Sequence, residues 1–103
     1  MISAADLNLW IESSMHGGAL MLAPYVRSAK DLDVQYDVRL STRGPGSTSN
    51  VAQSGTTAMK AGEAKRLAIL TTKSTPSGEC MLIVIVRKDD EILKEEHYDC
   101  AKP

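Results

Sequence analysis

The sequence contains no phenylalanine, and its aromatic residues, one tryptophan and three tyrosines, make up only 4% of the chain. Surfaces that stack the bases of single-stranded nucleic acid need several exposed aromatic side chains beside basic residues. An excess of basic charge is missing as well, because 12 lysines and arginines are balanced by 13 acidic residues. We therefore expect no nucleic-acid partner, and the 43% hydrophobic content is too high for a disordered chain.

Long apolar segments are also absent. The longest uninterrupted apolar run, Cys80–Val86, is far shorter than the roughly 20 residues that cross a bilayer, so we expect no membrane insertion. The first residues, MISAADLNLW, lack the basic and apolar regions of a secretory signal. The protein is expected either to act in the cytosol or to be a mature domain whose signal peptide has been removed.

Motifs for catalysis and for metal binding are missing too. No cluster of cysteines and histidines has metal-ligand spacing, and no Cys-x-x-Cys pair occurs, so we expect neither a metal nor a cofactor. The run from His97 to Cys100 combines a base, a carboxylate and a thiol, but His97 and Cys100 would point to opposite faces of a strand. A nucleophile and its base must lie within hydrogen-bonding distance. We do not expect an enzyme, and keep catalysis by this run only as a third hypothesis.

What the sequence does contain is alternation with a period of two. Between Leu32 and Thr42, leucines, valines and a tyrosine alternate with charged and polar residues, which predicts a long amphipathic strand. Cys80–Arg87 is apolar at both alternating sets of positions, which is typical of a central strand. Ser47–Ser54 is polar and small, and it fits either an edge strand or a flexible loop. Thr56–Gly62 contains good helix formers and could be mistaken for the start of a helix, but Gly55 and Gly62 confine it to about one turn.

These patterns, divided by frequent Gly, Pro and Ser turns, predict a single domain that covers residues 1–103. The expected fold is an all-β, seven-stranded antiparallel immunoglobulin-like β-sandwich. Its predicted strands are residues 6–15, 19–27, 32–43, 47–54, 64–73, 80–88 and 91–98.

The two cysteines lie on neighbouring predicted strands. If a three-residue turn spans Asp89–Glu91, Lys88 faces Ile92 and Cys80 lies directly opposite Cys100, at a separation that suits a disulfide. A two-residue turn would instead place Cys80 opposite Asp99. The three-residue turn favours a Cys80–Cys100 disulfide and an oxidising compartment, and the alternative is two reduced cysteines in a cytosolic protein.

An amphipathic strand that ends in Arg39–Arg43 is followed by the GPGSTSN turn, the small polar segment Asn50–Gly55, a short turn to Ala64 and two further strands. This order of segments resembles the CsgC/CsgH-type curli chaperones, and it is closest to the CsgH-like branch. The most specific stretch is Tyr36–Gly55. One departure is that the CsgC branch has a Cys-x-Cys pair, whereas the two cysteines here are 20 positions apart, so a thiol-exchange role is not carried over.

This resemblance implies a periplasmic protein that keeps curli subunits from polymerising into amyloid before they are secreted. Because curli subunits are in general acidic, we expect a local basic patch on a sheet face, or else an exposed sheet edge, to contact the client. The candidate client-binding residues are Arg39, Arg43, Lys73 and Arg87. We expect a monomer whose partners are curli subunits, and the second hypothesis is an extracellular or periplasmic adhesive or structural β-sandwich module.

Overall fold

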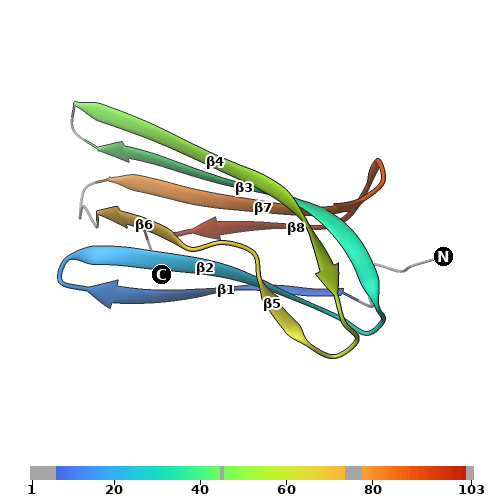
Figure 1. The fold of residues 1–103 in the computed structure, drawn as a ribbon. Helices are drawn as coiled ribbons and strands as arrows, with labels where there is room; N and C mark the ends of the chain where they lie inside the picture. Colours follow the sequence, from blue (N-terminus) through green and yellow to red (C-terminus); the bar gives the residue numbers. More distant parts are fainter. Residues whose placement is uncertain (1–6, 45, 74–77, 102–103) are drawn as a thin grey trace.

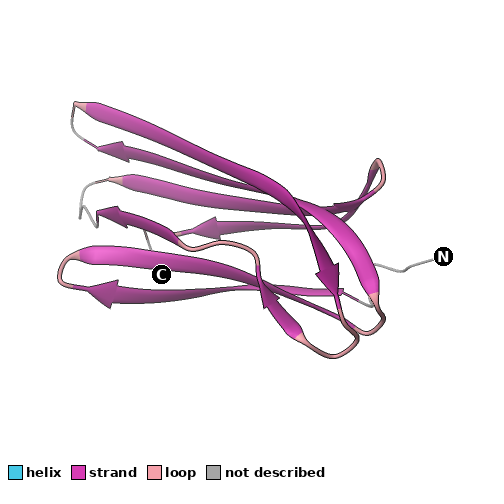
Figure 2. Cartoon of the chain, in the orientation of Figure 1, coloured by secondary structure: helices cyan, strands magenta, loops and turns pink. Residues whose placement is uncertain are grey.

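Eight β-strands and no helix form the regular structure of residues 7–44, 46–73 and 78–101, the part of the chain described by a computed structural model (Figures 1 and 2). They form two four-stranded antiparallel sheets. In the first sheet, β2 (Ala19–Ser28) pairs with β1 (Leu7–His16) on one side and with β5 (Ala64–Arg66) and β6 (Leu70–Lys73) on the other.

The second sheet has the strand order β4-β3-β7-β8. Its strands are β3 (Leu32–Gly44), β4 (Ser47–Met59), β7 (Glu79–Lys88) and β8 (Glu91–Asp99). The predicted all-β antiparallel fold is thereby confirmed, although with eight strands in place of seven. The immunoglobulin-like connectivity stays a prediction.

The two sheets face each other across a core made almost entirely of leucine and valine. Because side chains alternate between the two faces of a strand, every second residue of β3 points inward, and Leu32, Val34, Val38 and Leu40 are all buried. The other core residues are Leu7, Leu20, Leu22, Val26, Met59, Leu67, Leu70, Leu82, Val84, Val86, Leu93 and Cys100. The alternation read in the sequence therefore locates the core correctly in the second sheet.

The predicted single strand over residues 64–73 is wrong, because the structure has two short strands there. The cause is Pro24 of β2, which has no backbone N–H to give to a neighbouring strand. Leu67 N–H donates to the Pro24 carbonyl at 2.9 Å, so this side of Pro24 faces the break between β5 and β6. Pro24 still pairs with Ile11 of β1 on its other side. The proline therefore sits in a central strand, and it ends the pairing on one side only.

The helix formers in Thr56–Gly62 do not produce a helical turn. β4 continues through Thr56 to Met59, and the alternatives left open for residues 47–54 resolve as an edge strand. Met59 pairs with Leu32 and is buried, which favours the extended backbone over the helical preference of the local sequence. The chain turns only after Met59, where Gly62 has a positive φ of 80°. No helix that could span a membrane occurs in the described residues.

Candidate interaction surface

The outer face of the second sheet carries three of the four predicted client-binding residues. Arg39 and Arg43 lie on β3, and Arg87 lies on the adjacent strand β7. All three occupy strand positions that alternate with the inward-facing ones, so they project away from the core. Lys73 is exposed on β6 of the first sheet, and the structure does not place it on the same face.

Two of these three arginines form ion pairs with acidic neighbours. Arg87 Nη2 lies 2.9 Å from Asp37 Oδ2 in a partly buried pair, and Arg43 Nη1 lies 3.9 Å from Glu79 Oε2 in an exposed one. Arg39 is exposed, and within the described residues no carboxylate lies within 4.0 Å of it. Of these three arginines, Arg39 is thus the one that is free to pair with a client carboxylate.

An apolar strip runs between the charged positions on the outer face of β7. Met81, Ile83 and Ile85 project outward from this strand, and Met81 is 38% exposed. Ile83 lies directly opposite Arg39 of β3. The outer face therefore combines one unpaired cation with apolar side chains, and it is not uniformly basic.

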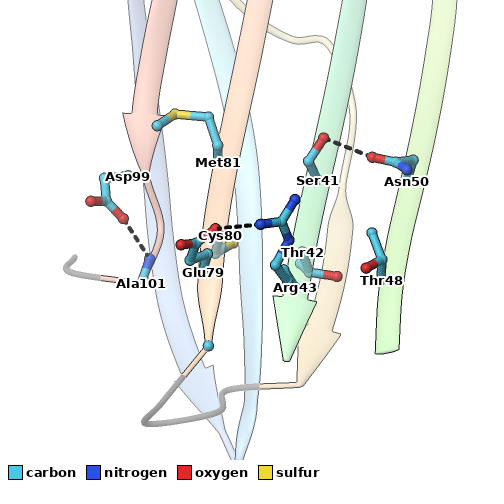
Figure 3. A pocket seen from close by; sticks show the side chains of 11 residues that line it. Ser41, Thr42, Arg43, Thr48, Asn50, Glu79, Cys80, Met81, Asp99 and Ala101 are labelled. Carbon is cyan, nitrogen blue, oxygen red and sulfur yellow. Dashed lines mark hydrogen bonds and ion pairs between the residues drawn. The ribbon is translucent and has the colours of Figure 1, made fainter. Parts of the chain in front are cut away.

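A shallow pocket of about 580 Å³ lies at the end of this face near the cysteines (Figure 3). Its lining mixes polar and apolar groups, most of them exposed. Ser41 Oγ donates to Asn50 Oδ1 at 2.9 Å, and Arg43 reaches toward Glu79. Asp99 Oδ1 accepts a hydrogen bond from Ala101 N–H at 3.0 Å. This pocket offers hydrogen-bonding groups without a buried titratable side chain, so it gives a contact surface more readily than a reaction site.

The cysteines form a disulfide, but the turn that was expected to align them is wrong. Lys88 pairs with Glu91 across a two-residue turn, which by itself would have placed Cys80 opposite Asp99. A register shift between Val86 and Arg87 leaves one residue of β8 unpaired, so that Val86 pairs with Lys94. The bulge restores the pairing that the disulfide requires, and the two Cα atoms are 5.0 Å apart.

The same bond bears on the hypothesis of catalysis by the His97–Cys100 run. The Cys100 sulfur is bonded to Cys80, so it cannot serve as a thiolate nucleophile in this state. His97 Nε2 instead lies 2.6 Å from Glu95 Oε2, two residues along the outer face of β8. In the described part of the chain, no group of three or more histidine, cysteine, aspartate or glutamate side chains is arranged to hold a metal ion.

Sequence reasoning missed an aromatic pair on the outer face of the first sheet. Trp10 of β1 and Tyr25 of β2 pair directly across the strands and stack, with ring centroids 5.7 Å apart. Trp10 Nε1 donates to Glu12 Oε2 at 3.1 Å. Two isolated aromatics 15 positions apart give no signal until the register of β1 against β2 is known.

The two outer strands of the second sheet differ strongly in their surroundings. β8 lies against β1 of the first sheet, where Tyr98 Oη and Ser13 Oγ are hydrogen-bonded at 3.1 Å. β4 is an outer strand beside β3 (Figure 1), and among the described strands it is hydrogen-bonded only to β3. All its residues from Thr48 to Ser54 are exposed. This includes Val51, which points to the inner face and is still 42% exposed. β4 therefore extends beyond the packed part of the sandwich and is open on both faces.

No protein-family model matches the sequence, and no curated protein is significantly similar to it. Solved structures do match. The solution structure of CsgH from R. palustris aligns with a TM-score of 0.75 and 14% identity, over 93% of this chain and 94% of CsgH. The E. coli curli protein CsgC aligns with a TM-score of 0.77 and 14% identity, over 89% of this chain and 95% of CsgC. This chain has the fold of CsgC and CsgH.

A third match is the sporulation control protein Spo0M from Bacillus subtilis, with a TM-score of 0.51 and 16% identity. The alignment covers 91% of this chain but only 47% of Spo0M, whereas CsgC and CsgH are covered almost completely. The resemblance to CsgC and CsgH read in the sequence is therefore confirmed for the fold. At this level of identity the fold alone follows, and function must be argued from the surface.

Proposed function

We propose that this protein is a chaperone of the CsgC/CsgH type that keeps curli subunits from polymerising prematurely. The observation that carries the proposal is the fold match to CsgC and CsgH, which extends over nearly the whole of all three chains. A disulfide between Cys80 and Cys100 fits an oxidising compartment, so we place the protein in the periplasm. We propose that the chain acts as one domain and as a monomer.

The contact with the client is proposed to begin electrostatically at the outer face of the second sheet. Arg39 is exposed and has no acidic neighbour in the described residues, so a client carboxylate can pair with it without displacing an existing partner. Arg43 is only loosely paired, since 3.9 Å separates it from Glu79 and both side chains are more than two thirds exposed. Arg87 already has Asp37 at 2.9 Å, so it contributes less to client capture.

The decisive experiment is a fibrillation assay with a purified curli subunit. The protein should lengthen the lag phase at ratios well below one to one, because a chaperone that acts on nuclei needs to contact only a small fraction of the subunits. An adhesive or structural β-sandwich module, the second candidate, should leave the lag phase unchanged at every ratio. Unchanged fibrillation in the presence of the folded, disulfide-bonded protein would overturn the proposed function.

The electrostatic contact is tested by charge reversal. Arg39→Glu with Arg43→Glu should weaken inhibition, whereas Lys60→Glu with Lys65→Glu, an equal change in net charge at exposed positions outside this face, should not. Lys73→Glu shows separately whether the first sheet takes part. If the Arg39 and Arg43 double variant folds normally and inhibits as well as the original protein, the contact does not depend on these charges.

A further inference from the structure

Among the outer strands of the described residues, β4 is the one that lacks the usual protections against pairing with a further strand. It is 13 residues long and contains no proline and no charged side chain between Ser47 and Met59. Its pairing with β3 runs over all 13 residues without a bulge. Natural edge strands are normally shortened, bulged, charged or covered, because an unprotected edge presents free N–H and C=O groups to any extended chain.

The other outer strands show those protections. β8 carries four acidic residues and a lysine, its pairing is shifted by a bulge, and it lies against β1. β5 and β6 are three and four residues long and carry Lys65, Arg66 and Lys73. β1, the other edge of the first sheet, carries Glu12 and lies against β8. The open edge of β4 is therefore a local feature and not a general property of the fold.

A strand added to β4 would lie close to the unpaired charge of Arg39. Arg39 pairs directly with Ala52 of β4, so both side chains lie on the outer face, and the small methyl group of Ala52 leaves the space beside the arginine open. The distance from β3 to an added strand is two strand spacings, about 10 Å. The long side chain of Arg39 and a carboxylate on the added strand can meet across that distance.

We propose that β4 is a strand-addition site, and that its occupant is an extended, otherwise uncharged client segment whose carboxylate faces Arg39 across Ala52. The inference rests on the proposed function for the identity of the client, because amyloid-forming segments combine low charge with high β-propensity. Main-chain hydrogen bonds to β4 provide the binding, and Arg39 selects the acidic segment. A second copy of this chain is a poorer occupant, since its β4 has no carboxylate to offer Arg39.

Single prolines on β4 test the proposal. Backbone N–H groups of successive residues on an edge strand point alternately toward the sheet and away from it. Of Ala52→Pro and Gln53→Pro, therefore, one removes an N–H that faces outward and keeps the pairing with β3. Pro24 shows in this molecule that a proline can end pairing on one side of a strand and leave the other side intact. The variant that keeps its thermal stability is the informative one.

We expect that variant to need at least about fivefold more protein to produce the same lag phase, the effect of losing one main-chain hydrogen bond. The matched control is whichever of Glu95→Pro and Glu96→Pro, on the opposite edge, keeps its stability, and it should inhibit normally. Should both prolines on β4 unfold the protein, Val51→Lys with Gln53→Lys replaces them, because both side chains are exposed and point away from Arg39. This pair should reduce inhibition although it adds positive charge, whereas a purely electrostatic contact would be strengthened.

The charge preference is measured with two synthetic probes. One is a 12-residue peptide of Ser, Thr, Gln, Asn and Val with a single central Asp, and the other has Lys in its place. We expect the Asp peptide to bind two- to fivefold more tightly, the range of an exposed ion pair. Arg39→Gln should abolish the difference. Hydrogen exchange should slow in residues 47–59 on binding and stay unchanged in residues 91–99.

The outcomes separate this inference from the proposed function. If the original protein does not delay fibrillation, the proposed function fails, and the peptide measurements still decide whether β4 accepts a strand. If the protein delays fibrillation but the stable β4 variants do so equally, strand addition is wrong and the chaperone stands. If sedimentation shows a dimer of the free protein that the β4 variants dissociate, the occupant is a second copy, which overturns the assignment to a client segment.

Discussion

The two edge strands of the second sheet, β4 and β8, have the same backbone hydrogen-bonding groups but differ in how well those groups are protected from a further strand. β8 has charged side chains, a bulge and a disulfide beyond its last residue, and it lies against β1 of the facing sheet. β4 is longer, uncharged and regular, and its residues 48–54 are exposed on both faces. One edge is closed and anchored while the other is open, so a partner that adds a strand has one direction from which to approach.

Removing the disulfide should cause the largest loss of stability, and it should loosen β8 more than β4. Cys80→Ser with Cys100→Ser opens a loop with a sequence separation of 20 residues, and we expect a loss of about 3 kcal/mol in the free energy of unfolding. Chemical denaturation measures the loss. Hydrogen exchange should accelerate in β8 and much less in β4, and equal acceleration at both edges would show that the bond does not anchor β8 specifically.

The next largest effect should come from filling the space at Gly55 in β4. A Cβ atom at this position would lie 2.8 Å from Tyr36 Oη and 3.1 Å from Tyr36 Cζ, so the ring would have to move. We expect Gly55→Val to cost about 1–3 kcal/mol in thermal or chemical denaturation. Ser54→Val is the control, because this exposed neighbour points to the outer face. A neutral Gly55→Val would mean that Tyr36 is not packed firmly over β4.

A smaller effect should separate the two ion pairs on the outer face. Asp37→Asn removes the partner of a partly exposed arginine, and we expect a loss of about 0.5–1 kcal/mol. Glu79→Gln breaks the pair with Arg43, whose side chains are 71% and 77% exposed, and stability should stay unchanged. Equal losses from the two substitutions in denaturation experiments would contradict the order of pairing proposed for these arginines.

The smallest expected change in stability comes from giving β8 the composition of β4. Lys94→Thr, Glu95→Thr and Glu96→Thr together should leave the unfolding midpoint nearly unchanged but should permit weak self-association, visible by sedimentation as the concentration rises. If the variant stays monomeric, the bulge in β8 and its contact with β1 protect this edge from self-association, and its charged side chains do not.

Much of the fold can be predicted from local sequence. The alternation in Leu32–Thr42 identifies the inward side chains of β3, and the apolar Cys80–Val86 run identifies the central strand of the second sheet. What could not be predicted depends on neighbours distant in sequence. Met59 stays extended because it packs beside Leu32, and the 64–73 strand breaks because it lies beside Pro24.

The disulfide shows how two errors of register can cancel. The cysteine pairing follows correctly from an assumed three-residue turn, yet the turn has two residues and a bulge in β8 supplies the missing shift. A bulge has no strong signal in this sequence, because no glycine or proline marks residues 92–94. The bond itself, which requires close approach of two Cβ atoms, is a stronger guide to the register than the turn.

The candidate interaction surface also combines features that the sequence predicts with features that depend on the tertiary structure. The sequence by itself determined which side chains face outward, including Arg39 and Arg43, since the orientation of a side chain depends only on its position along a strand. The tertiary structure decided that Asp37 and Glu79 occupy two arginines, that Lys73 lies on the other sheet, and that β4 is an open edge. Partners and edges are fixed by which strands pair across the whole chain, and the free energy of packing two sheets together selects that pairing.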